Sequence, residues 1–439
     1  MSAGKLSYRA REIEAWIESH MVDSNGVVYT FVDRATGKLL TNEVVETVDY
    51  IRLAKGTTAG WWAYENCSMV TASYMQAMLY RYEQEGDVSA LARARRSFGA
   101  LKYIYDIGKQ LEEGFMPKIY DNQFSEDTSS DQILYAILAL DHFHQHATDA
   151  EKAEISRMIA AIVRFFVKRE YKYTFGRTKA MQWPLARFTC KNLMAWRHSG
   201  DDFFKKEYER LLAMGVNEHP GEEQVRPKLA GKFKPNTLEQ EEGGWLLTYV
   251  TASAQMDLME LDYLLRNDPQ NAWAAKWKRS CIQMWNEGRI MIADDGRAYT
   301  TLVMDFETGE LRRLSKSQFL TRDANRTKVD NFGEPDIDQF SYYPYMLFVH
   351  SCKSAYTSPL FARSGIQVSE HFPRETTIRP LARRIIQSLD LRDMTYLDEP
   401  ELLAPQFRYR TNMISGDTVT NWLWAYWQGR TLNIFDETE

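Results

Sequence analysis

Buried helices alternate with amphipathic ones along this chain, and that alternation limits its fold more than any other feature. The segment 64–85 is rich in apolar and small residues, and 131–146 is apolar nearly all round. The segments that follow them, 88–110 and 149–173, mix Lys and Arg with one apolar face. A helix that is apolar all round must be covered on every side, whereas its partner faces water. The order predicts an all-α fold, the (α/α)6 toroid, in which six helical hairpins close a ring with short β-hairpin excursions.

About twelve helices fit this order, at roughly 55 to 70 residues per hairpin. The expected inner helices are 64–85, 131–146, a segment from 183, 244–267, 336–351 and 417–428. The expected outer helices are 6–20, 88–110, 149–173, 201–214, 269–287 and 376–389. An open helical solenoid would need a repeat of about 34 to 47 residues with recurring signature positions, which the sequence lacks. No Pro/Ser linker divides the chain, so we expect one domain over 1–439, with strand excursions near 26–40 and 297–306.

Composition excludes several classes of protein. With 26% charged and 44% hydrophobic residues among 439, the chain is that of an ordinary soluble globular protein. The net charge is −6 and no long basic block occurs, so neither nucleic acid nor a membrane is an expected partner. No apolar run approaches the roughly 18 residues of a membrane span. Charges throughout residues 1–20 argue against a signal peptide, which leaves the compartment open.

The four cysteines are far apart in the sequence. They are Cys67, Cys190, Cys281 and Cys352, with no CxxC pair among them. Zinc-ribbon and redox motifs therefore lack support, and we expect buried free thiols.

Two helix starts share one pattern. Ser129 can cap a helix and Gln132 can reach back to it, which is a capping-box signature that places Asp131 in the first turn. The stretch from Asp336 to Gln339 repeats this pattern, with Asp338 in the position of Asp131. Each acid has a structural explanation as well, because the helix dipole stabilises it by about 0.3 to 1 kcal/mol.

Carboxylates and aromatic rings gather at the expected helix starts. In such a toroid the amino-terminal ends of the inner helices share one face, so their first turns form the rim of a cavity. An aromatic content of 13% suits stacking on the apolar faces of sugar rings. The rim candidates are Trp61, Trp62, Glu65, Asp127, Asp131, Gln132, Trp183, Arg187, Glu241, Glu242, Asp336, Asp338, Tyr342, Tyr343, Tyr345 and Asp417.

The two matched aspartates predict a chemistry. Asp131 opens the second inner helix and Asp338 the fifth, so a six-fold ring places them on opposite sides of the cavity. Opposed carboxylates are the apparatus of glycosidic bond cleavage, one as general acid and one as base toward water. We assign the acid role to Asp131, because an acid that keeps its proton needs burial or like-charged neighbours, here Asp127 and Glu65. Asp338 is then the base, and Glu65 substitutes for either.

Other groups of residues point less clearly to a function. His142, His144 and His146 invite a metal-binding interpretation, since His142 and His146 are four apart on one helical face. They lie at the carboxyl end of their helix, where histidines complement the dipole, so we expect no metal. The chain also lacks the HExxH, GxSxG, GxGxxG and P-loop motifs, and no cofactor is expected.

Basic residues near the third inner helix suggest a possible role in substrate binding. Arg177 and Lys179 precede that helix and Arg187 lies within it. Together they offer a clamp for a substrate carboxylate, although basic residues in loops are more often only solvated.

A family resemblance rests on two stretches. GWWAYENCSMVTASYMQAMLYRYEQEGD and GFMPKIYDNQFSEDTSSDQILYAILALDHF resemble the first two inner-helix starts of bacterial six-hairpin glycosidase-like proteins. This superfamily includes unsaturated glucuronyl and rhamnogalacturonyl hydrolases. Glu65-Asn66 and Ser130-Asp131-Gln132 carry the resemblance most specifically. It implies an (α/α)6 barrel, carbohydrate chemistry and a match of Asp131 to a catalytic aspartate.

Three functions follow from these observations. The leading one is a glycoside hydrolase acting on an oligosaccharide partner, including uronic-acid-containing oligosaccharides. The second is a polysaccharide lyase on the same toroid, for which Tyr342, Tyr343, Arg187 and His219 supply candidate central residues. The third is a non-catalytic carbohydrate-binding protein whose acids only accept hydrogen bonds. The sequence does not specify an oligomeric state.

Overall fold

The computed structural model of the chain divides into two compact units. Unit 1 comprises Met1–Asn217 and Val419–Glu439, and unit 2 comprises Glu218–Thr418. The residues described are 6–39, 66–120, 123–124, 127–175, 178–182, 186–214, 252–289, 292, 295–297, 301–305, 311–313, 345–349, 354–395 and 412–436. The single domain expected over 1–439 stays a prediction. Among these residues no helix combines the length and the apolar character needed to cross a membrane.

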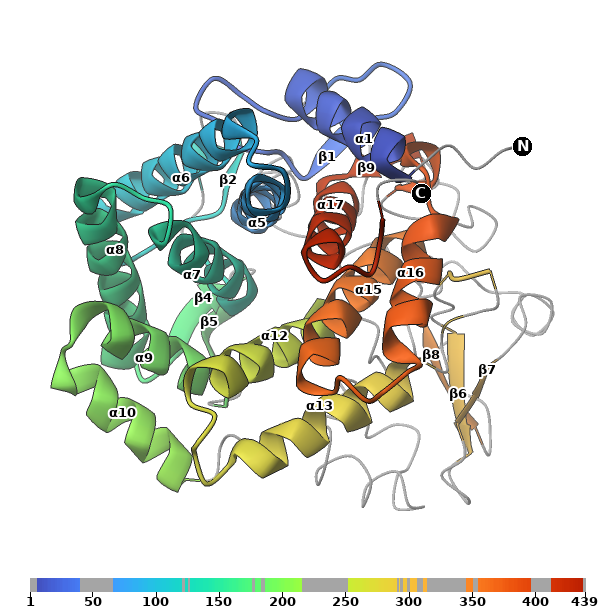
Figure 1. Ribbon diagram of the computed structural model, residues 1–439. Coiled ribbons are helices and arrows are strands. Elements are labelled where there is room, and N and C mark those ends of the chain that lie inside the picture. Colours follow the sequence, from blue (N-terminus) through green and yellow to red (C-terminus); the bar gives the residue numbers. More distant parts are fainter. Residues whose placement is uncertain are drawn as a thin grey trace. The chain divides into compact units, whose positions relative to one another are not determined.

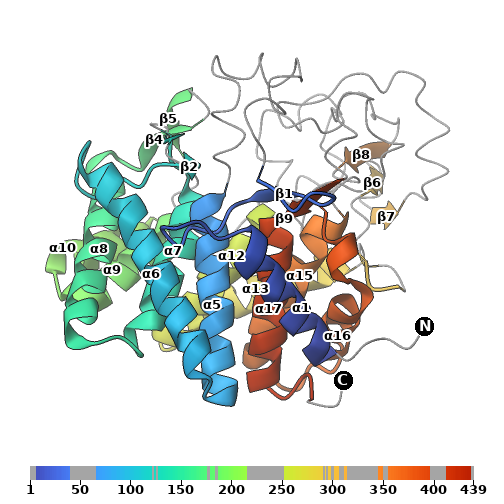
Figure 2. The ribbon, with the colours of Figure 1, turned by 90° about the horizontal axis from the view of Figure 1, so that it is seen from above.

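Unit 1 is built from helical pairs (Figure 1). Its helices are α1 (Leu6–His20), α5 (Cys67–Glu85), α6 (Val88–Lys109), α7 (Ser130–His144), α8 (Asp149–Lys168), α9 (Ala186–Ser199), α10 (Asp202–Ala213) and, from Val419 on, α17 (Gly416–Thr431). Helix α5 packs against α6, α7 against α8, and α9 against α10, while α7 also contacts α5 and α9. Figure 2 shows the first of these pairs side by side. The predicted helical hairpins are therefore present.

Helices α5, α7 and α9 run in one direction. Near the carboxyl ends, Glu83 Oε1 of α5 lies 2.8 Å from His142 Nε2 of α7. His198 Nε2 of α9 lies 2.8 Å from Asp141 Oδ1 of α7. Since the carboxyl ends of all three helices meet, their amino-terminal ends also lie at a common end of unit 1, as the sequence predicts for inner helices.

Burial separates the two kinds of helix. In α7 the five successive residues from Ile133 to Ile137 are each at most 1% exposed, which leaves no face of the helix open to water. In α8 the buried residues instead recur every three or four positions along one face. They are Ile155, Met158, Ile159, Ile162, Val163, Phe165 and Phe166. The alternation read from the sequence is confirmed for this pair.

Short antiparallel hairpins connect the helices of unit 1. Strand β1 (Phe31–Asp33) begins one of them, in which Val32 pairs with Leu39 across the predicted turn at Gly37. The others are β2 (Ile119–Tyr120) with β3 (Gln123–Phe124), and β4 (Lys172–Phe175) with β5 (Thr178–Gln182). The strand excursion predicted near 26–40 is therefore confirmed, whereas β2–β3 and β4–β5 were not predicted.

The described cysteines match the sequence interpretation. Cys67, Cys190 and Cys281 are buried free thiols, and Cys352 lies outside the described residues.

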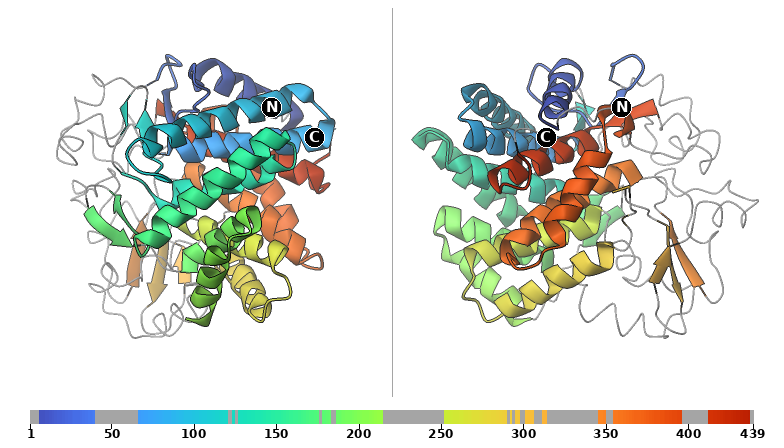
Figure 3. Two further views of the ribbon diagram at one scale, coloured as in Figure 1. Left: turned by 90° about the vertical axis from the view of Figure 1, so that its left-hand side faces the viewer. Right: turned by 45° about the vertical axis from the view of Figure 1, so that its right-hand side comes forward.

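Unit 2 combines four helices with a small sheet. The helices are α12 (Ala252–Asn267), α13 (Ala274–Arg289), α15 (Ser354–His371) and α16 (Ile378–Ser388), followed by the 3-10 turn Leu391–Asp393 and strand β9 (Met413–Ser415). Strands β6 (Thr301–Asp305), β7 (Leu311–Arg313) and β8 (Tyr345–Val349) form an antiparallel sheet in the order β7-β6-β8. Helix α15 packs against α12, α13 and α16, as the side views in Figure 3 show. His371 Nε2 lies 2.8 Å from Asp262 Oδ1, so the carboxyl ends of α15 and α12 also meet.

The inner helix expected over 336–351 is wrong. Its residues 345–349 form β8, where Leu347 pairs with Val303 of β6, and the helix of this hairpin is α15, from Ser354. Short apolar runs do not distinguish strand from helix by pattern alone, and an aromatic-rich run such as YMLFV suits a strand. Asp338 itself lies outside the described residues, so its expected place at a helix start stays a prediction.

Gly365 in α15 is required by close packing. A Cβ added there would lie 2.4 Å from Cζ3 of Trp285, whose buried ring stacks on Phe361 at 4.3 Å between centroids. Gly99 in α6 has nothing within 4 Å of such an atom. We expect Gly365→Ala to lower the free energy of unfolding by about 1 to 3 kcal/mol through overpacking. Gly99→Ala should raise it by about 0.5 to 1 kcal/mol. Denaturant unfolding measures both, and shifts of the same sign would contradict this account of Gly365.

Candidate functional site

The amino-terminal end of α7 differs from its predicted cap. Ser129 is the N-cap residue in extended conformation, but its side chain makes no cap hydrogen bond, so the predicted capping box is wrong. Asp131 Oδ1 instead accepts the backbone N–H of Gln132 at 2.9 Å. A carboxylate in the first turn is a stronger acceptor than a hydroxyl and is favoured there by the helix dipole. Asp131 therefore lies at the positive end of a buried helix and is only partly exposed.

The β2–β3 hairpin carries Asp127 to this helix start. The backbone N–H of Lys118, before β2, donates to the carbonyl of Asp127 at 3.1 Å. Both side chains are buried, with Lys118 at 1% exposed and Asp127 at 6%. Charged residues reach such burial only when they are paired or hydrogen-bonded. The approach to α7 therefore includes a buried cation and a buried carboxylate.

A sharp reversal after α8 brings Tyr173 to the same place. Glu170 and Tyr171 adopt left-handed conformations, with φ of 52° and 64°. The backbone N–H of Tyr171 donates to the carbonyl of Phe166 at 2.8 Å, which closes the end of α8. The helix expected over 149–173 thus ends at Lys168, and β4 begins directly after the turn.

Tyr173 lies among charged groups from two helix starts. Burial and the charge of Asp131 raise the pKa of Tyr173 above its usual range, while Ser130 and Arg187 act in the opposite direction. The tyrosine is 4% exposed and Arg187 2% exposed. A phenol with a raised pKa keeps its proton near neutral pH. Tyr173 is therefore a neutral phenol whose pKa responds to the charges of a carboxylate and a guanidinium, and we call Asp131, Tyr173 and Arg187 the α7 cluster.

The ring of Tyr173 packs within a group of aromatic rings. Its ring meets that of Phe166 edge-on at 5.7 Å between centroids. Phe188 of α9 lies 5.4 Å from Phe166 and 4.4 Å from Tyr171. Aromatic pairs at these separations are worth about 0.5 to 1.5 kcal/mol beyond their burial. The site is thus built on a rigid apolar base.

The first two turns of α9 contribute two buried basic residues, Arg187 and Lys191. Lys191 is 1% exposed, donates to the carbonyl of Arg187 at 2.8 Å, and lies 5.0 Å from the centre of the Phe188 ring. A cation near a helix start is opposed by the dipole by about 0.3 to 1 kcal/mol. Helix stability therefore does not explain the placement of Arg187, which instead fits the binding of an anionic group.

Gln132 and Ser129 add hydrogen-bonding groups next to the cluster. Gln132 is 3% exposed and Ser129 1% exposed. Within the described part of the chain, both amide atoms of Gln132 and the hydroxyl of Ser129 have no hydrogen-bond partner. Leaving such a buried group unpaired costs about 1 to 3 kcal/mol, so these atoms suit pairing with hydroxyl groups. Together with the α7 cluster they offer proton transfer, anion binding and polar recognition.

The predicted site residues divide into three groups. Asp127, Asp131, Gln132 and Arg187 lie at or before the starts of α7 and α9 in unit 1. Asp417 lies in the first turn of α17, in unit 2, and is fully buried. The remaining candidates lie outside the described residues: Trp61, Trp62, Glu65, Trp183, Glu241, Glu242, Asp336, Asp338, Tyr342 and Tyr343; of Tyr345 only the backbone is described. Their roles stay predictions.

Sequence reasoning missed Tyr173. It was included in an amphipathic helix over 149–173, and no residue pattern marks the left-handed turn at Glu170 and Tyr171. The polar Arg-Glu stretch before Tyr171 was the only available sign that α8 ends early.

Comparison with known proteins defines the fold first. No protein-family model matches the sequence, and no curated protein matches it. The chain has the all-α, (α/α)6 toroid fold that the sequence predicted, and it shares this fold with the solved structures that it matches.

Three solved structures match nearly the whole chain. An unsaturated glucuronyl hydrolase specific for heparin has a TM-score of 0.51 at 11% identity, over 99% of this chain and 98% of that one. A sugar epimerase from a ruminal bacterium has a TM-score of 0.52 at 10% identity, over 97% and 98% of the two chains. A D-mannose isomerase has a TM-score of 0.50 at 8% identity, over 98% of each. At these identities the likeness concerns the fold.

The turn that presents Tyr173 allows a test. Glu170 is exposed and adopts φ of 52°, a conformation that disfavours L-residues by about 1 to 2 kcal/mol. We expect Glu170→Gly to raise the free energy of unfolding by about 0.5 to 1 kcal/mol, because glycine adopts this conformation freely. Glu209→Gly, within helix α10, is the matched control and should lower it by about 1 kcal/mol. Thermal or denaturant unfolding compares the two, and a loss of stability in Glu170→Gly would refute the left-handed turn.

Proposed function

We propose that this protein is a carbohydrate-active enzyme that hydrolyses glycosidic bonds in oligosaccharides. Its fold is that of proteins named as a glucuronyl hydrolase, a sugar epimerase and a mannose isomerase, all of which act on sugars. Because one fold hosts several sugar reactions, the choice among them depends on the site residues. The observation that carries the proposal is the α7 cluster, in which the charges of Asp131 and Arg187, at two helix starts, both act on the phenol of Tyr173.

Each residue of the cluster takes a part in hydrolysis. Asp131 transfers a proton to the glycosidic oxygen as the bond to the anomeric carbon breaks. A water molecule adds to that carbon and gives its proton to a second carboxylate, for which Asp338 and Glu65 remain the candidates. Tyr173, held neutral, donates a hydrogen bond to Asp131 or to a substrate oxygen. Gln132 pairs with a sugar hydroxyl.

Arg187 supports a substrate that carries a carboxylate. Its guanidinium is close enough to Tyr173 to influence the pKa of the phenol, and it is buried, where a cation interacts strongly with an anion. A uronic acid next to the scissile bond meets this requirement, since guanidinium and carboxylate form paired hydrogen bonds. The proposed substrates are therefore uronic-acid-containing oligosaccharides.

The same cluster weighs against elimination. A polysaccharide lyase removes a proton from the carbon next to a carboxylate, and a tyrosine that does so must lose its own proton readily. Burial and Asp131 raise the pKa of Tyr173, which is the opposite of what such a base needs. The described residues therefore favour a proton donor over a carbon base.

Replacement of Asp131 tests the proposal. We expect Asp131→Asn to cut turnover by about two to four orders of magnitude, the usual worth of a positioned proton-transfer group. The change should cost at most about 1 kcal/mol of stability, because asparagine still accepts a hydrogen bond at the helix start. Asp149→Asn is the matched control, since Asp149 lies in the first turn of the outer helix α8, and it should keep the wild-type rate.

The assay is product detection on a panel of plant and bacterial oligosaccharides. It includes the ultraviolet absorbance of unsaturated uronides, which a lyase creates and an unsaturated-uronide hydrolase consumes. Wild-type turnover in folded Asp131→Asn would remove Asp131 from the mechanism. A gain of absorbance would establish elimination instead of hydrolysis.

Tyr173→Phe tests the second residue of the cluster. Removing the hydroxyl leaves the ring against Phe166, so folding should be kept, whereas a lost hydrogen bond to the reacting groups should slow turnover by about tenfold to a hundredfold. The measurement is kcat and KM on the substrate found for the wild type. An unchanged kcat would assign Tyr173 a structural role only.

A further inference from the structure

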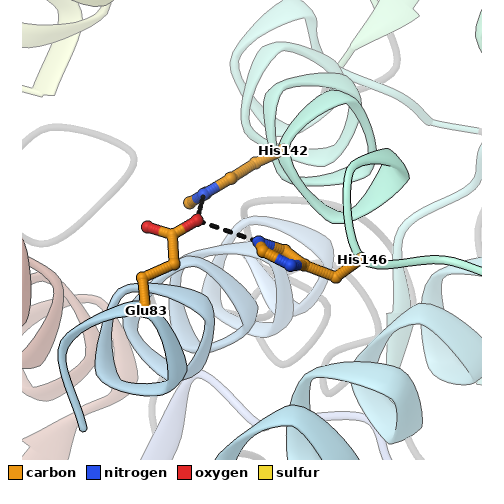
Figure 4. A group of neighbouring side chains, drawn as sticks. All are labelled: Glu83, His142 and His146. Carbon is orange, nitrogen blue, oxygen red and sulfur yellow. Dashed lines mark hydrogen bonds and ion pairs between the residues drawn. The ribbon is translucent and has the colours of Figure 1, made fainter. Parts of the chain in front are cut away.

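Three potential metal ligands meet at the other end of α7. Glu83 Oε1 of α5 lies 2.8 Å from His142 Nε2 and 2.9 Å from His146 Nε2 (Figure 4). One ligand atom from each residue lies within 4.8 Å of the others. The three side chains are 28%, 13% and 20% exposed, so the group is open to solvent on one side. Two imidazoles thus point their Nε2 atoms at a single carboxylate oxygen.

The imidazole of His142 is oriented by a further group. Its Nδ1 lies 2.6 Å from Oε1 of Gln76, a side chain that is 4% exposed. A carbonyl oxygen at Nδ1 accepts the proton on that nitrogen, which leaves the lone pair of Nε2 available to a metal ion bound beside Glu83. Metal-binding histidines commonly have such a partner on the ring nitrogen that does not bind the metal.

The rings of both histidines are also packed. The ring of Tyr80 lies 4.8 Å from that of His142, and the ring of Tyr82 meets that of His146 edge-on at 5.4 Å. Both tyrosines belong to α5, the helix that carries Glu83. The ligand atoms are thus held in place by contacts that do not depend on a metal ion.

We propose that Glu83, His142 and His146 bind a divalent transition-metal ion, with zinc as the preferred ion. Two imidazole nitrogens and one carboxylate oxygen are ligands that zinc takes at about 2.0 to 2.2 Å, with water in the fourth position. Ligand atoms of a tetrahedral zinc site lie about 3.3 Å apart, so each histidine needs to move about 0.5 Å from the carboxylate oxygen, and ligand atoms that lie farther apart than this need to approach. Each imidazole binds the ion through the lone pair of Nε2 and keeps its proton on Nδ1, and a second proton on a charged ring is released to solvent.

An alternative explanation is a plain cluster of hydrogen bonds at a helix end. Histidines at the carboxyl end of a helix complement its dipole, and Glu83 alone can accept their N–H groups. That account predicts no particular partner for Nδ1 of His142. The buried Gln76 is the additional observation, because its carbonyl orients the imidazole of His142, whose Nε2 lies at the same carboxylate oxygen as Nε2 of His146.

The proposed site lies away from the α7 cluster. Asp131 and His142 are eleven positions apart on one helix (142 − 131), or about 16 Å along its axis. A metal ion there joins the carboxyl ends of α5 and α7 and does not reach the proposed catalytic residues. The proposed role of the metal ion is structural. A protein that binds no metal could therefore still be a hydrolase, and a protein without hydrolase activity could still bind the metal.

Metal titration of the full chain tests the site. Tag-free protein is stripped with a chelator and titrated with Zn2+ by calorimetry and with Co2+ by visible absorption. We expect one equivalent to bind, with a rise in melting temperature. Glu83→Gln and His146→Gln should each weaken binding by at least about tenfold, and Gln76→Leu by about 10- to 100-fold.

His144→Gln is the matched control. His144 lies on the same helix between the two proposed ligands, but its ring packs edge-on against His198 at 4.9 Å. It should bind Zn2+ as the wild type does, with the same Co2+ spectrum. Circular dichroism of each variant verifies folding, and Glu83→Gln, a nearly isosteric change at a partly exposed residue, is the variant least expected to disturb it.

Three results would overturn the proposal. The first is a wild-type protein without saturable Zn2+ or Co2+ binding below millimolar concentration. The second is unchanged affinity in folded Glu83→Gln and His146→Gln, and the third is an equal loss in His144→Gln.

Discussion

The burial of α7 on every side is the constraint on which unit 1 depends. Five successive residues from Ile133 to Ile137 are closed to water, so the helix needs neighbours around its whole circumference. Helices α5, α8 and α9 are among the helices that contact it. A helix satisfies its own backbone groups along its length but not at its ends. Polar chemistry on such a helix is therefore confined to its first and last turns.

The two ends of these helices carry different chemistry. At the amino-terminal ends Asp131 accepts the backbone N–H of Gln132, and the charges of Asp131 and Arg187 both act on Tyr173. At the carboxyl ends, cations and histidines pair with acids: His142 with Glu83, and His198 with Asp141. The dipole explains the second arrangement, because it favours positive charge at a carboxyl end. It does not explain Arg187 in the first turn of α9, and this is why the amino-terminal end is the better candidate for a functional site.

The sequence predicted those features that depend on hydrophobic period. Helices α5 to α8 follow from apolar residues on all faces or on one face, and so does their pairing. The fifth hairpin could not be predicted in this way, since the run YMLFV of β8 has no period that distinguishes a strand from a helix. Helix α15 was not predicted, and its sequence contains Pro359 and Gly365, two residues that are unfavourable in a helix interior. Its glycine is explained only by the ring of Trp285, a contact between helices that no local pattern reveals.

The sequence predicted those residues of the candidate site that local patterns mark, and missed those that tertiary contacts bring together. Asp127, Asp131, Gln132 and Arg187 mark helix starts and are visible in the sequence. Tyr173 depends on a backbone reversal that neighbouring helices hold in place. The pairing of Glu83 with two histidines about sixty positions away could not be predicted either, because it depends on the packing of α5 against α7.

The outer helix α10 takes part in holding that reversal. Left-handed conformations at Glu170 and Tyr171 cost of order 1 to 3 kcal/mol each, and persist only where surrounding structure fixes them. The hydroxyl of Tyr171 donates to Glu207 of α10 and accepts from Asn192 of α9 at 3.3 Å. Arg210 in turn donates to Glu207, which keeps this carboxylate charged and lowers its pKa. Because Tyr171 is anchored to both helices, β4 leaves the turn in a fixed direction and carries Tyr173 to the start of α7. The position of a proton donor in the proposed site therefore rests on a hydrogen bond made at the outer layer of the fold.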